Sequence, residues 1–379
     1  MALSSTSVGR AFGFGITEIA FLTVYAVTVL LIPRLAIVAR LTSVATLCAL
    51  TYALQITFFQ WCDNPHWRGF AAASLPVQFL SASEIIWHQN PPLPAGKTAI
   101  SRVVGAISLL WNMRRIGTKW QVPNVKTTFL TRAQFLRCRL ATTFVTYIIL
   151  DAFISAPAPA PSLITSDKQS LLFKNMSSKD IAFRIIGSVS YWFTGFLYVL
   201  VVSNLIAIAL VATGLSSPSD RPQLFGSVKD SYTLRNFWGV VWHSCLRSCL
   251  ISHADFVADK ILRFPRGTLL SRYTRIFSAF LISGIIHAIC ERGMGVSGKE
   301  GGGLVFFPAQ ALGIMLEDGA QWVAGSRSQH WRLRQIIGYI WVVAFLSWAS
   351  PAWFYPHLRA GNDPGSLLPV RAVNRLLKF

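Results

Sequence analysis

The chain has 379 residues, of which 53% are hydrophobic and only 13% are charged. Because a soluble domain usually carries about 25% charged residues, this composition excludes an ordinary water-soluble fold and indicates lipid as the main solvent. The net charge of +20 could also indicate that the chain binds nucleic acid. However, Lys and Arg lie between apolar blocks and form no single basic face. We therefore expect a lipid bilayer, and no nucleic acid, as a partner of this chain.

Apolar blocks long enough to cross a bilayer, which takes roughly 20 residues, recur along the chain. In chain order we expect about eight spans, at 16–38, 41–60, 69–87, 139–156, 182–213, 274–292, 303–324 and 335–355. The first block is long enough to serve as an uncleaved anchor, so no cleavable signal peptide is expected. The expected fold class is therefore an all-α, polytopic membrane helical bundle. We expect residues 1–379 to form a single integral membrane domain with its core at about 55–355.

The loops between these blocks differ in charge, and this difference predicts the orientation of the chain. Segment 88–138 holds eight Lys and Arg residues and no acid, so it is expected in the cytoplasm. Loop 157–181 carries both signs of charge and a sequon that begins at Asn175, which fits the luminal side. With eight spans, the basic tail after Arg359 falls in the lumen, against the positive-inside rule. Because no sorting signal argues otherwise, the endoplasmic reticulum is the expected membrane.

Segment 233–262 has apolar runs too short to span a membrane, and it mixes Trp, Phe, Leu, Arg and His. We expect amphipathic helices there, lying at the cytoplasmic interface with their Trp side chains at headgroup depth. The six cysteines are scattered and complete no zinc-binding pattern. All six are therefore interpreted as small hydrophobic residues, and no metal site is expected.

An ionisable residue, His287, lies deep in the expected span 274–292. It follows Ser283 and Gly284, about 13 residues from the start of the span, which corresponds to roughly 20 Å at 1.5 Å per residue. An ionisable group at such a depth is a functional-site hypothesis by default. The alternative is a neutral histidine hydrogen-bonded to a neighbouring helix, because Ser and Gly allow helices to approach closely.

A second group of candidate residues precedes His287 in the chain, between Thr233 and Arg247. Trp238 and Trp242 are four residues apart, as are His243 and Arg247, so each pair is expected to share a helix face. The alternative is an interfacial aromatic anchor with basic neighbours.

The order of these motifs points to a known family. Phe-Trp-x-x-x-Trp-His at 237–243, followed by Ser-Gly-x-x-His at 283–287, resembles the wax-synthase branch of the membrane-bound O-acyltransferases. Three further fragments agree in order: 111–120, which resembles the branch's Arg-Gly-Ile-Gly stretch, Tyr147–Asp151, and Phe306–Gln310 with Glu317 beyond. Arg115 stands in place of the first glycine of the Gly-Ile-Gly motif. The resemblance covers the chain from about 55 to 355.

This resemblance implies an enzyme that moves an acyl group directly from a CoA thioester to an alcohol. His287 is then the general base that takes the proton of the hydroxyl. His243 is expected to orient the reactants or to donate to the oxyanion, and Asn236 is a further catalytic candidate. Four residues are expected to bind the acceptor: Trp238, Trp242, Gln310 and Glu317.

CoA is a polyanion and is expected to approach from the cytoplasmic side. The basic residues that are candidates to bind its phosphates are Arg114, Arg115, Lys119 and Arg247. The alternative is that these residues only fix the topology. No cofactor is expected to stay bound, and acetyl-CoA, or a longer acyl-CoA, is the expected co-substrate.

Short fungal proteins of this branch acetylate terpenoid or meroterpenoid alcohols in secondary-metabolite biosynthesis. The resemblance therefore favours acetyl-CoA as donor and a hydrophobic small-molecule alcohol as acceptor. A long-chain wax-ester synthase is the alternative within the same family.

Two other classes of protein compete with this interpretation. Asp255 and Asp259 share a helix face, as Mg²⁺–pyrophosphate binding in a prenyltransferase or terpene cyclase requires, but no second Asp-rich motif is present. Acidic residues in or near the spans, such as Glu84 and Asp151, also suit a membrane transporter, but the chain shows no inverted repeat. Glu84 and Asp151 are instead interpreted as buried hydrogen-bonding partners. The oligomeric state is left open.

Overall fold

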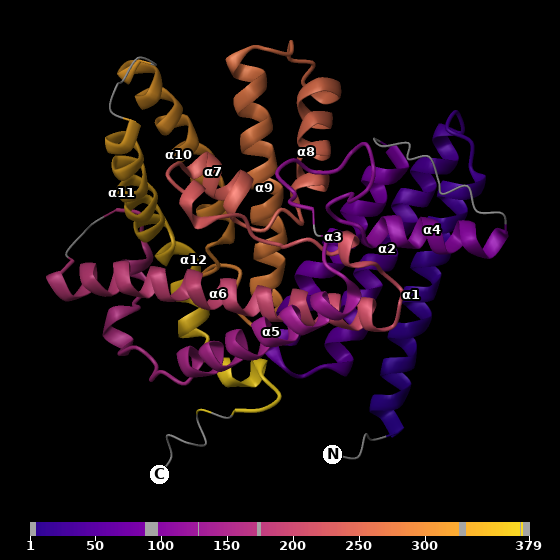
Figure 1. Cartoon of the computed structure of the whole chain (residues 1–379), viewed down its shortest axis with the longest axis horizontal. Helices are drawn as coiled ribbons and strands as arrows, with labels where there is room; N and C mark the ends of the chain where they lie inside the picture. Colours follow the sequence, from indigo (N-terminus) through magenta and orange to yellow (C-terminus); the bar gives the residue numbers. More distant parts are fainter. Residues whose placement is uncertain are drawn as a thin grey trace. The chain divides into compact units, whose positions relative to one another are not determined.

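The computed structural model describes residues 5–87, 98–127, 129–172, 176–325, 331–371 and 373. Within these ranges the regular structure is entirely helical (Figure 1), which confirms the expected all-α class. The chain divides into two compact units, each made of two separate stretches. Unit 1 comprises Met1–Val122 and Cys245–Gly298, and unit 2 comprises Pro123–Ser244 and Lys299–Phe379. The expectation of a single domain stays a prediction.

Unit 1 is built around α3, which packs against α2, α8 and α9. Its helices are α1 (Ser5–Leu31), α2 (Ile37–Trp61), α3 (Pro65–Trp87), α4 (Ala99–Trp111), α8 (Arg247–Phe256) and α9 (Leu269–Gly293). The apolar faces of α1 and α2 meet in a core that includes Phe21, Leu47 and Leu54. The Tyr25 hydroxyl, buried in the same core, donates a hydrogen bond to the Ala106 carbonyl of α4 at 3.1 Å. A buried hydroxyl requires such a partner.

A close helix crossing fixes α9 on α3. A Cβ atom at Gly69 would lie 2.4 Å from Met294 Cγ, and a Cβ atom at Gly293 would lie 2.8 Å from Ala72 Cβ. Because neither position leaves space for a side chain, glycine lets the two backbones approach each other directly. The crossing therefore anchors the C-terminal end of α9.

Helix α4 lies within segment 88–138, which the charge pattern predicts as a loop. Thr98 begins this helix with a capping box, in which its side chain accepts from the Ser101 N–H while the Ser101 hydroxyl accepts from the Thr98 N–H. Leu109 and Leu110 are buried on one face of the helix. The loop prediction is wrong for residues 99–111 because a count of charges over the whole segment hides the apolar run inside it.

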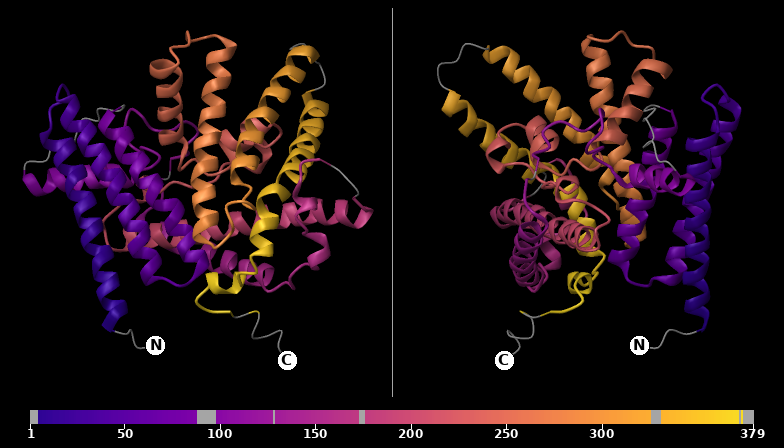
Figure 2. Two further views of the ribbon diagram at one scale, coloured as in Figure 1. Left: turned by 180° about the vertical axis from the view of Figure 1, so that it is seen from behind. Right: turned by 45° about the vertical axis from the view of Figure 1, so that its right-hand side comes forward.

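Unit 2 contains six α-helices in the described ranges. They are α5 (Arg132–Ile154), α6 (Ser178–Ala212), α7 (Leu234–Asn236), α10 (Gly303–Ala324), α11 (Trp331–Ala349) and α12 (Pro351–Arg359). Figures 1 and 2 show α5 alongside α6, both steeply inclined to α10 and α11. The longest helix, α6, begins at a capping box in which the Ser177 side chain accepts from the Asp180 N–H. The sequon residue Asn175 lies outside the described residues.

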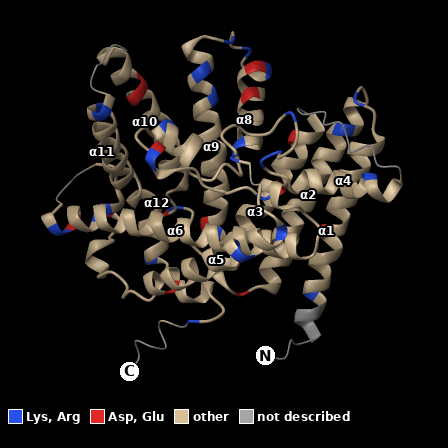
Figure 3. Ribbon diagram, viewed as in Figure 1, with Lys and Arg blue, Asp and Glu red and all other residues tan. Residues whose placement is uncertain are grey.

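Among the residues that the structure describes, five helices are long and apolar enough to cross a membrane: α1, α2, α3, α6 and α9. The pair α11 and α12, bent by 43° at its break, adds a sixth if it forms one span. Figure 3 shows basic residues toward one end of α9. In the sequence of this helix the charges lie near its two ends, at Arg272 and Arg275 and at Glu291 and Arg292, with an uncharged stretch between. Each of the eight expected spans overlaps a helix, but 16–38 runs past the end of α1 at Leu31 into α2, and 335–355 crosses the break between α11 and α12. The count of eight is not confirmed, because α5 and α10 are not among the candidate spans.

The chain after α12 is tied back onto unit 2. Arg371 Nε donates to Asp151 Oδ1 of α5 at 2.9 Å, and the Val373 N–H donates to Asp151 Oδ2 at 2.8 Å. The Tyr147 hydroxyl donates to the Val370 carbonyl at 2.6 Å. Asp151 is fully buried, so these contacts satisfy a carboxylate that water cannot reach. The prediction that Asp151 is a buried hydrogen-bonding partner is confirmed.

Candidate functional site

His287 lies on α9 of unit 1 with its ring half-buried. Its Nδ1 atom is 2.7 Å from the carbonyl oxygen of Ser283, one turn earlier in the same helix. Because a carbonyl oxygen can only accept, Nδ1 carries the proton in this contact, and in the neutral ring Nε2 then holds the lone pair. The local backbone thus selects the tautomer whose Nε2 is basic, as a general base requires.

The helix that carries His287 is longer than the sequence predicts. It begins at Leu269, five residues before the expected span 274–292, and ends at Gly293. His287 is therefore six residues from the C-terminal end of α9, or roughly 9 Å along its axis. This end of the helix is the one that the Gly69 and Gly293 crossing anchors on α3.

The segment 233–243 belongs to unit 2 and is not one regular helix. The Thr233 hydroxyl accepts from the Asn236 N–H at 2.9 Å and begins α7. A π-helical turn, η5 (Phe237–Val241), follows, in which the Trp242 N–H donates to the Phe237 carbonyl five residues earlier at 2.7 Å. Such π turns occur frequently at functional sites. Asn236 lies half-buried where α7 meets this turn.

Trp238 and Trp242 lie in a cluster of aromatic rings within unit 2. The ring of Trp192, on α6, is 5.7 Å from Trp238 and 4.8 Å from Trp242, in edge-to-face geometry. Trp238 also packs against Phe306 of α10 at 6.3 Å, and Phe306 stacks on Trp353 of α12 at 5.3 Å. Both rings thus pack against side chains of α6 or α10, and the expectation that they lie at headgroup depth stays a prediction.

His243 follows the π turn and lies half-buried, with its ring 5.4 Å from Trp242 and 6.0 Å from Phe225. The expectation that His243 and Arg247 share a helix face is wrong. The backbone becomes extended at Trp242, and the next helix, α8, begins only at Arg247. The expected amphipathic segment 233–262 is thus interrupted, and its two parts belong to different units.

Gln310 and Glu317, both on α10, face protein groups. Gln310 Oε1 accepts from Trp238 Nε1–H at 3.2 Å, while Gln310 Nε2 donates to the Phe306 carbonyl at 3.1 Å. Glu317 Oε2 accepts from the Leu234 N–H at 2.6 Å and from Trp341 Nε1–H at 3.2 Å. The polar atoms that were expected to bind the acceptor are therefore bonded within unit 2.

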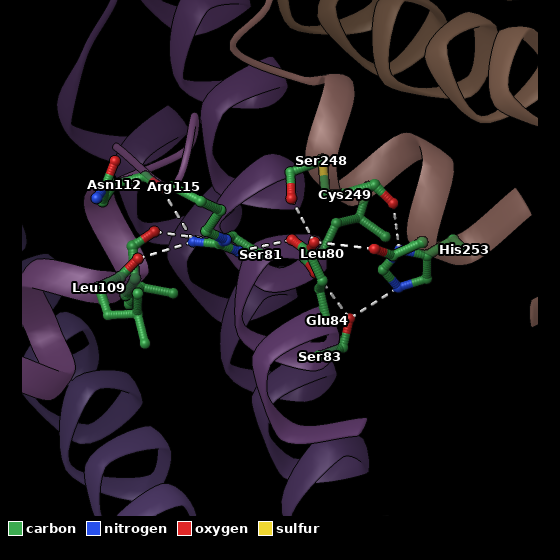
Figure 4. A network of polar contacts seen from close by, with 12 residues as sticks. Leu80, Ser81, Ser83, Glu84, Leu109, Asn112, Arg115, Ser248, Cys249 and His253 are labelled. Carbon is green, nitrogen blue, oxygen red and sulfur yellow. Dashed lines mark hydrogen bonds and ion pairs between the residues drawn. The ribbon is translucent and has the colours of Figure 1, made fainter. Parts of the chain in front are cut away.

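Among the four residues expected to bind CoA, Arg115 differs from the other three because it is fully buried (Figure 4). Its Nη2 atom is 2.6 Å from Glu84 Oε2, and both side chains are 0% exposed. Its Nη1 atom donates to the Leu109 carbonyl at 2.8 Å. The expectation that Arg115 binds phosphate is wrong, because its guanidinium is enclosed in unit 1.

The other three basic residues are more accessible. Lys119 is exposed, with its Nζ atom 4.6 Å from the centre of the Trp120 ring, and Arg114 is half-buried. Arg247 is also half-buried, and this burial lowers the pKa of its guanidinium. Their role in CoA binding stays a prediction.

Glu84 is the centre of a polar network that joins α3 to α8 (Figure 4). Its Oε1 atom accepts from the hydroxyls of Ser248 at 2.5 Å and Ser252 at 2.9 Å. Beside it, His253 Nε2 lies 3.0 Å from the Ser83 hydroxyl, and His253 Nδ1 lies 2.7 Å from the Cys249 carbonyl. The interpretation of Glu84 as a buried hydrogen-bonding partner is confirmed. His253 escaped the sequence analysis because it is not deep in any expected span.

Asp255 and Asp259, the pair that suggested a pyrophosphate site, are bonded to arginines of unit 1. Arg266 Nη2 is 2.5 Å from Asp259 Oδ2, and Arg275 Nε is 2.7 Å from Asp255 Oδ1. The hydrogen bond from Arg266, together with the charge of Arg275, lowers the pKa of Asp259. No group of three or more His, Cys, Asp or Glu side chains in the described ranges is arranged to hold a metal ion.

Comparison with known proteins identifies a family and several relatives. A model of the membrane bound O-acyl transferase family matches residues 221–309, which include both the 233–243 segment and His287. Acetyltransferase aurG of Calcarisporium arbuscula is similar to this chain, with 30% identity over 71% of this chain and 69% of the relative. Acetyltransferase atnC of an Arthrinium species is 32% identical over 70% of this chain and 65% of the relative. Acetyltransferase spyB of Aspergillus fumigatus is 30% identical over 68% of this chain, which spans only 48% of that relative.

Proposed function

This chain belongs to the membrane-bound O-acyltransferase family, and from that membership we propose that it transfers acetyl from acetyl-CoA to a hydroxyl group of a terpenoid or meroterpenoid. It is a multi-pass membrane protein, and we propose the endoplasmic reticulum as its membrane. The three relatives are all named acetyltransferases, which supports acetyl as the transferred group. The observation that carries the proposal is His287, whose Nδ1 contact with the Ser283 carbonyl leaves Nε2 as the basic nitrogen.

In the proposed reaction the hydroxyl oxygen of the acceptor attacks the carbonyl carbon of the thioester. His287 Nε2 takes the hydroxyl proton as the new C–O bond forms, so that a tetrahedral oxyanion results. Collapse of this intermediate breaks the C–S bond, and the proton held on Nε2 goes to the departing sulfur of CoA. The products are the acetate ester and CoA with a free thiol, and no covalent enzyme intermediate is needed. We propose that Asn236, Trp242 and His243 supply donors to the oxyanion.

The acceptor and the donor require different surroundings. We propose that the rings of Trp238 and Trp242 bind the apolar acceptor, since aromatic side chains bury much apolar area. We propose that Arg114, Lys119 and Arg247 bind the phosphates of CoA as charge-assisted hydrogen-bond donors. Acetyl-CoA is a co-substrate in this scheme and does not remain bound.

The test is an assay of microsomes with radiolabelled acetyl-CoA and a pool of terpenoid alcohols. We expect wild type to transfer label and His287→Ala to transfer at least about a hundredfold less, the usual loss for a general base. His253→Ala is the matched control, because His253 Nδ1 makes the same 2.7 Å contact with a carbonyl one turn earlier but has no proposed catalytic role. The control should retain activity within a few-fold of wild type.

Each outcome of this assay has a defined meaning. Equal transfer by His287→Ala and wild type contradicts His287 as the base and leaves the reaction class standing. Transfer only from long-chain acyl-CoA supports the wax-ester alternative over acetyl transfer. If wild type transfers no acyl group from either donor to any alcohol, the proposed function fails.

A further inference from the structure

One face of α10 holds the segment 234–242 at successive turns. Gln310, Gly313 and Glu317 are spaced by three and four residues, so they lie on the same side of the helix. Each of them contacts a residue of the segment that carries Asn236, Trp238 and Trp242. All of these residues belong to unit 2.

The first attachment fixes the start of the segment. Glu317 accepts from the Leu234 N–H at 2.6 Å, and the residue is only 7% exposed. The Leu234 side chain is fully buried, and a Cβ atom at Gly313 would lie 2.7 Å from Leu234 Cδ1. Glycine at 313 therefore lets Leu234 pack directly onto the helix, beside the carboxylate that binds its backbone.

The second attachment fixes the orientation of one ring. Gln310 is fully buried, and its two amide atoms have complementary roles. Its nitrogen donates to the Phe306 carbonyl, which can only accept, so its oxygen must face the Trp238 Nε1–H, which can only donate. Both ends of the amide are thus satisfied by protein groups, and the hydrogen bond selects one orientation of the Trp238 ring.

The segment needs such support because its own backbone is weakly constrained. α7 has three residues and the π turn has five, lengths that are marginal without tertiary contacts. Asp318, the neighbour of Glu317, adds only a partly exposed ion pair with Arg235 at 2.6 Å, which contributes little in comparison.

We infer that Gln310 and Glu317 are positioning residues, which hold Trp238 and the start of α7 in the geometry that binds the acceptor and do not themselves touch it. This inference rests on the proposed function for its kinetic part. Its consequence is that Gln310 acts through Trp238. Removing the amide should weaken acceptor binding only while the Trp238 indole N–H is present.

A double-mutant cycle tests this dependence. We expect Gln310→Leu to raise the KM for the acceptor about tenfold, the effect of one buried hydrogen bond, with the KM for acetyl-CoA unchanged. In a Trp238→Phe background, Gln310→Leu should cause no further increase. Glu317→Leu should lower activity, whereas Glu317→Gln, which keeps an acceptor oxygen for the Leu234 N–H, should restore most of it. Asp318→Asn is the control and should stay near wild type.

A measurement without substrate separates this inference from the proposed function. In detergent-solubilised protein labelled with 5-fluorotryptophan, Trp238→Phe identifies the ¹⁹F resonance of Trp238. Gln310→Leu should shift or broaden that resonance and leave most others in place, with the protein still monodisperse. An unchanged Trp238 resonance, or equal increases in acceptor KM with and without the indole, would overturn the positioning role. If wild type itself transfers no acyl group, only the proposed function is contradicted.

Discussion

Arg115 has a backbone conformation that few residues other than glycine adopt. Its φ angle is +54°, in the left-handed region, and Arg115 occupies the position of the first glycine in the Gly-Ile-Gly motif. The strain of a side chain in this region is about 1 kcal/mol or more. The guanidinium compensates by pairing with the buried carboxylate of Glu84, so the departure from the motif at Arg115 depends on a partner 31 residues earlier.

This dependence predicts an ordered series of stabilities. Arg115→Gly removes the strain but leaves Glu84 buried without its cation, so we expect a loss of about 3–5 kcal/mol in the free energy of unfolding. Adding Glu84→Gln to Arg115→Gly should recover a large part of that loss, because the uncompensated charge is gone. Denaturation of purified protein by titrated SDS measures each value.

Arg115→Ala is the matched control for the backbone. It removes the same ion pair as Arg115→Gly but keeps a Cβ atom at φ +54°, so it should be less stable than Arg115→Gly by about 1 kcal/mol. Equal stability of the two variants would contradict the strain. A double variant no more stable than Arg115→Gly would show that the ion pair does not account for the loss.

At the scale of elements, the C-terminal strap, the described residues 368–371 and 373, is a structural part of unit 2. Leu368 packs in a core cluster with Leu150 and Leu197, and Arg371 and Val373 bind the buried Asp151. A chain that ends at Pro369 loses both donors to Asp151. We expect it to be less stable than the full chain by about 3 kcal/mol or more, the cost of an unpaired buried charge.

The matched control for the strap is a chain that ends at Val373, which keeps every described contact to Asp151. Thermal unfolding of the detergent-solubilised proteins should give a midpoint near that of the full chain for this control and a clearly lower one for the chain ending at Pro369. Equal midpoints for the two truncations would contradict a structural role for the strap.

The locations of the helices could be predicted from the sequence, whereas the π turn and the packing of the side chains could not. Every expected span overlaps a helix because a long apolar run satisfies its own backbone groups in lipid by forming a helix. The π turn at 237–241 did not follow, since periodicity does not distinguish it from an α-helix. Likewise, the packing of Trp238 depends on Trp192, Gln310 and Phe306, which are far away in the chain. The location of His287 within a long apolar helix did follow, because an ionisable residue inside an apolar run is visible in the sequence, while its role as the base stays a prediction.

At the scale of the whole molecule, contacts within unit 2 place two loops on one side of the membrane. Arg359, at the end of α12, donates to the Ile164 carbonyl at 2.8 Å and also binds Gln169 Oε1. Because groups in hydrogen-bonding contact cannot be separated by a bilayer, the loop after α5 and the end of α12 share a side. With eight expected spans, the tail falls on the same side as loop 157–181, in agreement with these contacts.

Cysteine labelling in sealed microsomes checks this topology. In a background without native cysteines, Ser162→Cys and Ala360→Cys, both at exposed positions, should react alike with a membrane-impermeant maleimide. Both should be protected until detergent is added if the side is luminal. Lys126→Cys, in the basic segment expected in the cytoplasm, is the reference for the opposite side. Labelling of Ser162→Cys and Ala360→Cys from opposite sides would contradict the shared location.

The interleaving of the two units has a consequence for biosynthesis. The chain passes from one unit to the other at residues 122–123, 244–245 and 298–299. A ribosome therefore delivers the first three helices of unit 1 long before α9, the helix that crosses α3 at Gly69 and Gly293. Until α9 has been synthesised, the side of α3 that packs against α9 in the folded protein lacks that partner. The packing of α3 on α9 can therefore form only after most of the polypeptide has been synthesised.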